Sequence, residues 1–343
     1  MKISFKIKVT LLILGTLLTF SSAFVNLNEK SNTNISNNQE VSSKMPDAKP
    51  LISGSWTASF IYIILDNWSD PCEYVQERAG TLADPHIIEN MTIDAKNSPI
   101  YGGILIAGCE QYFIIRNCSI SNAAYGGGGI YLVYTTHGKI ENNTCTSNDG
   151  FGVFLYGSPN NTIIDNEINN NGQGGIIVEP DFDLTAYSDN NTIINNTISN
   201  NNQDGILLSS CENNTIRGNI IENNGWDGIW IDDSDKNTIY NNTISNNEYG
   251  VFLTDSSYNK VFNNTFVSNN QCIVEMGTCI GNILTPNTCI PNSIAPSSDD
   301  DDGGGDGSNA PKISGYDLVI ISLTIIIASS ALSFVLLKKR TRS

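Results

Sequence analysis

Apolar and polar residues alternate in short runs that recur along most of the chain. Each repeat carries an aliphatic marker residue, and successive markers are 22 to 30 residues apart. The markers are Ile88, Ile115, Ile140, Ile163, Ile193, Ile216, Ile239, Val261 and Ile283. Later in each repeat comes a run of the form Gly-aliphatic-x-aliphatic, such as Ile206 and Leu208 after Gly205. A fixed period of this size is typical of a repeat architecture.

An alternation with a period of two indicates strands that bury one face. The strands are short, turn residues separate them, and no repeat contains a helical pattern long enough to cross between strands. Each strand must therefore pair with the same strand of the neighbouring repeat. The sequence predicts an all-β fold, a single-stranded right-handed parallel β-helix of about eight rungs over residues 87–290. The right hand is the general rule for parallel crossovers.

An asparagine stands three residues after most of the markers. These asparagines are Asn143, Asn166, Asn196, Asn219, Asn242 and Asn264. In a coil they stack, so each amide can donate to one neighbouring rung and accept from the other. Asparagine also tolerates the left-handed backbone of a tight corner, and we expect it to hold that corner here. Met91 and Cys118 occupy the position in the first two repeats, so the ladder is expected to begin in the third.

The segments before the repeats differ in composition. Residues 1–23 combine lysines, an apolar run and small residues, as in a secretory signal peptide. Residues 24–51 are polar and without periodicity, which predicts a disordered spacer. Residues 52–86 hold two tryptophans and an apolar run. A solenoid exposes strand edges at its open end, so we interpret this segment as an N-terminal cap.

The segments after the repeats predict an anchor. Residues 291–317 form an acidic, Gly/Asp-rich linker, and residues 318–337 contain no charged residue. A stretch of this length spans a bilayer, and the basic tail of residues 338–343 then lies in the cytoplasm. The sequence therefore predicts a single-pass protein of the cell membrane, with the β-helix outside. A cleavable sorting signal of similar composition is the alternative.

Charge and cysteine content fit an extracellular protein. The chain has 18 Lys and Arg against 35 Asp and Glu, a net charge of −17, so we expect no nucleic-acid partner. Cys272, Cys279 and Cys289 cluster near the end of the repeats, where one disulfide would close the coil. Several Asn-x-Ser/Thr sequons occur in predicted turns, and the glycosylation candidates are Asn160, Asn190 and Asn213.

One column of outward-facing positions is apolar. It lies in the Gly-aliphatic-x-aliphatic strand and comprises Leu105, Tyr131, Phe154, Ile177, Leu207, Trp230 and Phe252. Exposed apolar stripes mark binding surfaces, and the aromatic members, Tyr131, Phe154, Trp230 and Phe252, are suited to sugar rings. Two insertions, residues 121–128 and 179–189, flank the strand from opposite ends. The alternative is that the inserted loop or the N-terminal cap covers the stripe.

Carboxylates in two columns are candidates for chemistry. Asp204 and Asp227 precede glycines of adjacent repeats and should stack one strand spacing apart, as an acid pair or as plain turn residues. Asp232 is a third candidate, in a column that we expect to include Glu179 and Asp255.

Glu179 lies beside Asp181 and Asp183 of the second insertion, and these three are the candidates for a calcium site. We expect no other metal and no organic cofactor.

The motif Asn-Thr-Ile-x-x-Asn-x-Ile-x-x-Asn…Gly-Ile-x-Leu of residues 191–208 resembles the NosD-like β-helix proteins, also called the carbohydrate-binding and sugar-hydrolysis repeat family. The run GTLADPHIIEN and the flanking segments are similar to archaeal surface β-helix proteins. The resemblance implies an extracytoplasmic carbohydrate-handling or adhesion scaffold. NosD itself implies copper maturation, but the chain has only His86 and His137 and four methionines, so copper ligands are scarce.

These patterns favour a membrane-anchored extracellular module that binds carbohydrate, mediates adhesion or serves as a structural element, without catalysis. Its partners would be an extracellular polysaccharide or glycoprotein, and the membrane. The alternative is a polysaccharide lyase, hydrolase or epimerase that acts on the outer face of the β-helix.

Overall fold

The computed structural model describes residues 56–64, 66–68, 75–100 and 102–291. The predicted signal peptide, spacer and transmembrane helix lie outside these residues, as do the linker beyond residue 291 and the tail. No helix within the described part is both long and apolar enough to cross a membrane.

The described chain forms 28 strands in three sheets and one short 3₁₀ helix, η1 (Ala95–Asn97). Sheet A consists of β1 (Trp56–Ala58), β5 (Met91–Asp94), β8 (Ser119–Ser121), β11 (Thr144–Thr146), β14 (Glu167–Asn169), β17 (Thr197–Ser199), β20 (Ile220–Glu222), β23 (Thr243–Ser245), β26 (Thr265–Val267) and β28 (Thr288–Ile290). Sheet B consists of β2 (Ile61–Ile64), β6 (Ile104–Ala107), β9 (Gly128–Val133), β12 (Phe151–Tyr156), β15 (Ile176–Glu179), β18 (Ile206–Ser209), β21 (Ile229–Asp232), β24 (Tyr249–Thr254) and β27 (Gln271–Met276). Sheet C consists of β3 (Val75–Gln76), β4 (His86–Glu89), β7 (Phe113–Arg116), β10 (Gly138–Glu141), β13 (Thr162–Ile164), β16 (Thr192–Ile194), β19 (Thr215–Arg217), β22 (Thr238–Tyr240) and β25 (Lys260–Phe262).

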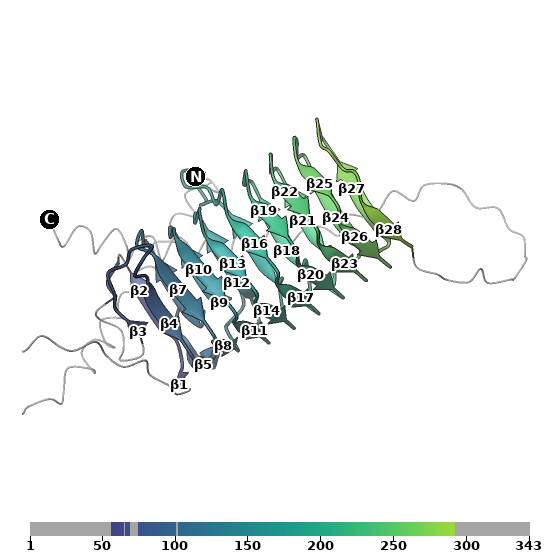
Figure 1. Ribbon diagram of the computed structural model, residues 1–343. Helices are drawn as coiled ribbons and strands as arrows, with labels where there is room; N and C mark the ends of the chain where they lie inside the picture. The colour runs from purple at the N-terminus through teal and green to yellow at the C-terminus, as the bar shows by residue number, and fades with distance from the viewer. Residues whose placement is uncertain (1–55, 65, 69–74, 101, 292–343) are drawn as a thin grey trace, which may run out of the picture. The chain divides into compact units, whose positions relative to one another are not determined.

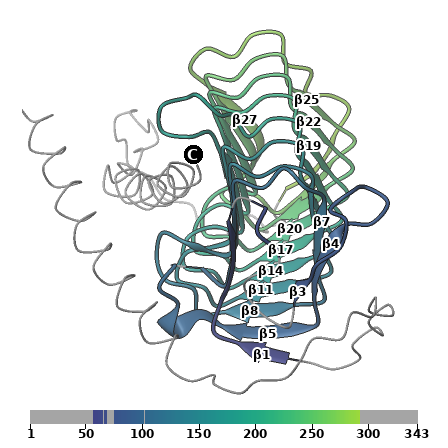
Figure 2. The same cartoon turned by 90° about the vertical axis from the view of Figure 1, so that its left-hand side faces the viewer.

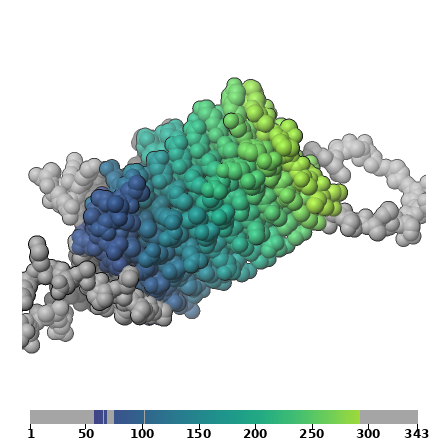
Figure 3. All heavy atoms as spheres, in the orientation of Figure 1, coloured from purple at the N-terminus to yellow at the C-terminus, as the bar shows by residue number. Residues whose placement is uncertain are grey.

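From β4 to β27, each rung contributes one strand to each sheet, and each strand pairs in parallel with its counterpart in the next rung (Figure 1). Seen from the N-terminal end, the three sheets enclose one continuous interior (Figure 2). The rungs follow one another in chain order along the coil, as the colour gradient of Figure 3 shows. The predicted parallel β-helix is therefore confirmed.

The coil is longer than the sequence predicted, with about nine turns rather than eight, because strands form within residues 52–86. β1 pairs in parallel with β5, and β2 with β6, so the segment that we interpreted as a cap extends two of the sheets. β3 runs antiparallel to β4 and ends sheet C. Beside it the indole ring of Trp68 stacks on the imidazole of His86, with 4.4 Å between ring centroids.

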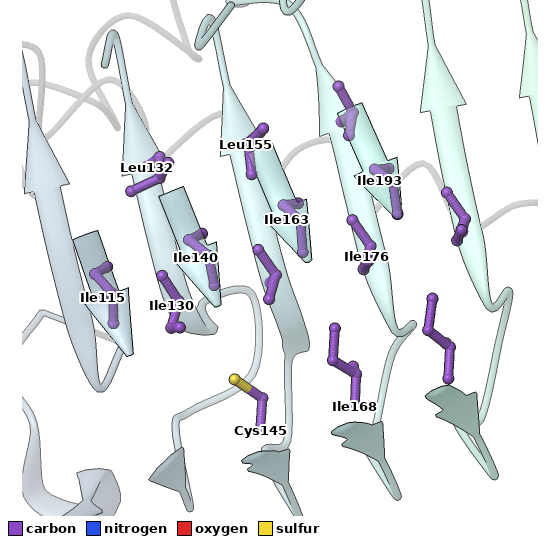
Figure 4. Packing of buried hydrophobic residues seen from close by; sticks show 14 of the residues in the cluster. Ile115, Ile130, Leu132, Ile140, Cys145, Leu155, Ile163, Ile168, Ile176 and Ile193 are labelled. Carbon is purple, nitrogen blue, oxygen red and sulfur yellow. The ribbon is translucent and has the colours of Figure 1, made fainter. Parts of the chain in front are cut away.

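The aliphatic residues form files through the interior. Ile115, Ile140, Ile163 and Ile193 pair in register and are fully buried, and Figure 4 shows them in a row on neighbouring strands, from Ile115 at the left to Ile193 at the right. The last predicted marker was wrong by one residue. Ile283 pairs with Lys260, which places Leu284 next to Val261, and it is Leu284 that packs against the core.

The predicted asparagine ladder is present and begins with Asn143. In a typical step, the Asn219 side-chain oxygen accepts the backbone N–H and the amide N–H of Asn196, at 2.8 and 3.0 Å. The Asn219 amide in turn donates to the Asn242 side-chain oxygen at 2.9 Å. Asn287, which the sequence analysis missed, accepts from Asn264 and extends the ladder by one rung.

Further ladders that the sequence analysis missed occupy other corners. A second ladder joins Asn148, Asn171, Asn201, Asn224, Asn247 and Asn269. A third joins Asn161, Asn191, Asn214, Asn237, Asn259 and Asn282. At the end of sheet B, the hydroxyls of Ser158 and Ser188 likewise accept backbone N–H groups from the preceding rung. Buried backbone N–H groups at these corners thus receive partners from the next rung.

The left-handed corner is not held by the ladder asparagine itself, which corrects our expectation. Positive φ falls on the preceding residue, as at Asn142 (53°), Asn195 (55°) and Asn241 (56°), and these three side chains are exposed. The six ladder asparagines that the sequence predicted point inward and are no more than 2% exposed, as at Asn143. The two asparagines of an Asn-Asn pair therefore have separate tasks, one in the turn and one in the hydrogen-bond ladder.

The disulfide that we expected near the C-terminal end joins Cys272 of β27 to Cys289 of β28. It links the last strands of sheets B and A, while Cys279 is free.

Candidate functional site

The outer face of sheet B carries three columns of side chains, which the register defines. The apolar stripe is Leu105, Tyr131, Phe154, Ile177, Leu207, Trp230 and Phe252. On the side toward the strand ends lies the carboxyl column, Tyr156, Glu179, Ser209, Asp232 and Thr254. On the side toward the strand starts lies the corner column, Phe151, Gly174, Asp204, Asp227 and Tyr249.

The apolar stripe divides into two halves. Its N-terminal half is buried, with Tyr131 and Phe154 at 1% and 0% exposure and their rings stacked at 4.5 Å. Its C-terminal half, Leu207, Trp230 and Phe252, is partly exposed. There the rings of Trp230 and Phe252 stack with 6.2 Å between centroids. Of the four aromatic residues predicted as a binding stripe, Trp230 and Phe252 therefore reach the protein surface.

Trp230 has a defined orientation because its indole N–H donates to the Thr254 hydroxyl at 3.0 Å, across to the next rung. The ring of Tyr249 meets Phe252 at an angle of 62°, with centroids 5.3 Å apart. These contacts join the partly exposed rings to the neighbouring columns and fix the orientation of the rings.

The insertion after β15 is organised by Asp181. Its carboxylate accepts the backbone N–H groups of Thr185 and Ala186 at 2.6 and 2.9 Å, the Thr185 hydroxyl at 2.5 Å, and the Tyr134 hydroxyl at 3.5 Å. Phe182 donates its N–H to the Tyr156 hydroxyl at 2.6 Å, which fastens the loop to the carboxyl column. Asp181 therefore acts as an anchor for the loop.

The calcium candidates do not converge. The oxygens of Asp181 already accept hydrogen bonds within the loop, and Asp183 is exposed. Across the described residues, no three His, Cys, Asp or Glu side chains form a group that could hold a metal ion.

Asp204 and Asp227 stack in the corner column, as their spacing predicted, and both are almost fully buried at 4% and 5% exposure. Asp204 accepts the Asp227 N–H at 3.0 Å, and Asp227 accepts the Tyr249 N–H at 3.0 Å. Burial raises the pKa of Asp227 to about 7, and burial together with the Asp227 charge raises the pKa of Asp204 well above its usual range. Both carboxyls thus serve as rung-to-rung acceptors, like the ladder amides.

Glu179 and Asp232 share the carboxyl column, separated by Ser209 of the intervening rung. Burial raises the pKa of Glu179 to about 8. The pKa of Asp232 rises to about 6, chiefly through burial and then through the charges of Asp233 and Asp255. At neutral pH, Glu179 therefore keeps its proton while Asp232 is mostly ionised.

Asp255 does not belong to this column, contrary to our expectation. Thr254 is the residue that pairs with Asp232, and Asp255 follows one position later at φ 48°. Its carboxylate accepts the Thr278 N–H at 2.7 Å in the turn of the next rung.

Tyr131 adds a group that the sequence analysis counted only as an aromatic ring. Its hydroxyl is buried without a hydrogen-bond partner. Burial, followed by the charge of Glu179 and then by Tyr156 and Tyr134, raises the pKa of Tyr131 well above its usual value. The outward Tyr in an apolar run was the only signal for this hydroxyl in the sequence.

The glycosylation candidates Asn160, Asn190 and Asn213 lie at equivalent corners of three consecutive rungs. All three are exposed, with φ of 57°, 59° and 58°. Their side chains are accessible for modification at the corner that follows sheet B.

Two family models match consecutive parts of the chain. One is described as a right-handed β-helix region and matches residues 51–186. The other is described as the periplasmic copper-binding protein NosD and matches residues 183–292. A comparison with curated proteins found no match.

Several solved structures are similar in fold. The mannuronan C-5 epimerase AlgE4 A-module of Azotobacter vinelandii is 18% identical, with a TM-score of 0.46, and the match covers 59% of this chain and 61% of that one. Pectate lyase Pel9A is 15% identical, with a TM-score of 0.36 and coverage of 57% and 59%. The tailspike of E. coli bacteriophage HK620 is 14% identical, with a TM-score of 0.45 and coverage of 59% and 40%.

The chain thus spans about three fifths of the length of the epimerase module, 61%. At these identities and TM-scores, the likeness assigns no activity and no substrate to this chain.

Proposed function

This chain is a right-handed parallel β-helix repeat protein, and we propose that it binds a polysaccharide along the outer face of sheet B. We further propose that it does so outside the cell, anchored through residues 318–337. The observation that carries the binding proposal is the partly exposed pair of stacked rings, Trp230 and Phe252, on a rigid sheet.

The chemistry of the face supports a sugar ligand. Flat aromatic rings offer the apolar faces of sugar rings a large contact area at little cost in side-chain entropy. Hydroxyl and carboxyl groups of Ser209, Asp232 and Thr254 run beside the rings and can exchange hydrogen bonds with sugar hydroxyls. Leu207, Trp230 and Phe252 lie on three successive rungs, so the partly exposed face is elongated along the coil, which suits a chain of sugar units better than a single one.

The test compares matched aromatic variants in affinity electrophoresis through purified polysaccharides. Trp230→Ala and Phe252→Ala should lose retention relative to the wild-type chain. The control is Tyr240→Ala, because Tyr240 stacks on Phe262 at 5.2 Å on the outer face of sheet C and is also partly exposed. Equal retention of Trp230→Ala and Tyr240→Ala would contradict binding at sheet B.

The location is tested separately on intact cells of the native host. If residues 318–337 anchor the chain, added protease should degrade the β-helix without breaking the cells, and removal of these residues should release it into the medium. Protection of the β-helix until the cells are lysed would contradict the external location and leave the binding test unaffected.

A further inference from the structure

We propose that the C-terminal end of the coil docks on the surface of the lipid bilayer, with apolar side chains at the level of the headgroups and Lys260 against their phosphates. This inference rests on the anchor proposed above, residues 318–337, and it is independent of what binds to sheet B.

Exposed apolar side chains gather at this end of the coil, where β25, β27 and β28 lie together (Figure 1). Eleven large apolar side chains are exposed in the described chain, and four of them, at 48–57% exposure, lie at or beyond residue 258. We call these four, Tyr258, Ile280, Ile283 and Ile290, the end patch. Tyr258 donates its N–H to the Ile280 carbonyl at 2.8 Å, and Ile283 pairs with Lys260, so the patch spans adjacent rungs. Exposed apolar clusters mark contacts with a protein partner or with a membrane.

The interior of the coil does not require these apolar residues. In the last rung, Ile273 and Leu284 already pack against the core. Ile283 comes one residue before Leu284 and remains half exposed, although a polar residue would suit an exposed position at least as well. The apolar character of the end patch therefore needs a reason other than folding.

The strands beside the patch carry cations without counter-ions. Lys260 is exposed and Arg217 is partly exposed, and neither forms an ion pair with any described residue. By contrast, the cations of earlier rungs of sheet C, Arg116 and Lys139, pair with glutamates of the same sheet. From β13 to β25, no strand of sheet C contains Asp or Glu. In a chain with a net charge of −17, such a surface fits the phosphate groups of lipids.

Two carboxylates at this end, Glu275 and Asp255, are held away from that surface. Glu275 lies in β27 of sheet B and accepts the Asn282 amide at 2.7 Å. Asp255 lies in the turn after β24 and accepts the Thr278 N–H at 2.7 Å. The side of the end that Lys260 occupies therefore keeps its positive charge.

Aromatic rings extend the patch along sheet C. Tyr240 and Phe262 stack with 5.2 Å between ring centroids and 2° between planes, and both are partly exposed. Tyr258 precedes β25, so its ring adds to the same side. Tyrosine favours the boundary between water and lipid, because its ring enters the apolar layer while its hydroxyl stays hydrated.

The position of the patch favours the membrane over a protein partner. The 26 residues 292–317 separate the last described rung from the proposed anchor. A Gly-rich chain of this length bridges roughly 30 Å on average, which keeps this end of the coil close to the bilayer. Tethering raises the effective concentration of the patch at the membrane to the order of millimolar. Contacts too few to recruit a free protein are therefore sufficient for docking.

The experiment reconstitutes the full chain in vesicles of phosphatidylcholine with phosphatidylglycerol, and part of the lipid carries brominated acyl chains. A fluorophore is attached at Ile280→Cys. Cys72 and Cys279 are replaced by Ser, because the other free cysteines are buried. We expect bromine to quench this fluorophore strongly. The matched control is Ile220→Cys, an exposed position on sheet A three strands from the end, which should be quenched little.

Substitutions at the patch test its chemistry. Lys260→Gln should lower the docking equilibrium by about fivefold on anionic vesicles and leave it unchanged on pure phosphatidylcholine. The control is Lys236→Gln, because Lys236 is also exposed but is already paired with Glu212 at 2.7 Å. Ile283→Ser should reduce quenching at residue 280 without changing the urea midpoint, since its side chain is half exposed.

The outcomes separate docking from anchoring. Equal quenching at residues 280 and 220, in chain that stays with the vesicles after a carbonate wash, would overturn docking and leave the anchor intact. Release of the chain by that wash would contradict the anchor, and with it this inference. Quenching at residue 280 that is the same on anionic and neutral vesicles would overturn the role of Lys260.

Discussion

The asparagine ladder gives the most quantitative prediction, because each member has known partners on both sides. Consider Asn219→Ala. The backbone N–H of residue 219 keeps its bond to the Asn242 side-chain oxygen, at 2.9 Å. The backbone N–H of Asn196, which the Asn219 side-chain oxygen accepts at 2.8 Å, loses its partner. A buried N–H group left unpaired costs about 1–3 kcal/mol, so the variant should lose about that much in free energy of unfolding.

The assay combines urea unfolding with amide hydrogen exchange. A stacked coil need not unfold in one step, so the midpoint alone would be ambiguous. The exchange rate of the Asn196 N–H reports the loss at that corner, and it should rise by about 0.7 to 2 powers of ten for the same free energy. Asn202→Ala is the control, since Asn202 is exposed and its backbone N–H, not its side chain, bonds the Asn171 carbonyl.

The reasoning would be refuted if the free energies of unfolding of Asn219→Ala and Asn202→Ala differed by less than about 0.5 kcal/mol, which is below the cost of one unpaired buried group. Unchanged exchange at Asn196 would refute it independently. Either result would mean that water or backbone rearrangement satisfies the ladder corner as well as asparagine does.

Other predictions address the site and the surface. The fold raises the pKa of Glu179 to about 8, so ionisation of Glu179 opposes folding above its ordinary pKa. Glu179→Gln should therefore match the wild-type chain in stability near pH 4 and exceed it increasingly up to pH 8. A difference in urea midpoint that stays constant with pH would contradict this. Tyr131→Phe removes an unpaired buried hydroxyl and should raise the free energy of unfolding by about 1 kcal/mol, whereas a loss would indicate an unseen partner. Gly205→Ala should be strongly destabilising in thermal unfolding, because a Cβ there would lie 2.5 Å from the Ile221 side chain. Chain from the native host should carry glycan at exposed Asn213, and Asn213→Gln should abolish the mass shift on deglycosylation at that site.

Much of the fold could be predicted from the sequence because residues that pair in register recur at regular intervals along the chain. The aliphatic markers from Ile88 to Val261 align as expected, since each must face the same interior. The final marker failed because Ile283 and Leu284 are both aliphatic, and only the pairing with Lys260 distinguishes them. The first turn was missed because its strands lie in a segment without the Asn-Thr motif.

The site was harder to predict because the burial and the pKa values of its residues depend on contacts between different rungs. Alternation correctly placed Trp230 on the outer face, but no pattern shows that Tyr131 is buried there and Trp230 is not. The raised pKa of Glu179 depends on how the surrounding chain shields it from water. Its place in one column with Asp232 depends on the length of the loop after Glu179. Asp255 was assigned to the wrong column because it follows its glycine by five residues, whereas Asp232 follows Gly228 by four.

The ladders also determine which insertions the β-helix can accept without losing hydrogen bonds. Every ladder bond joins equivalent positions of adjacent rungs, so duplication of one whole rung gives each new residue a neighbour of the kind it already had. A single inserted residue between Asn214 and Asn219 would instead shift one ladder against another and leave both without partners on that side. Variation in length is tolerated where the loop bulges out between ladder positions, as it does between Glu179 and Ser188. Gene duplication can therefore extend this protein by steps of a full turn.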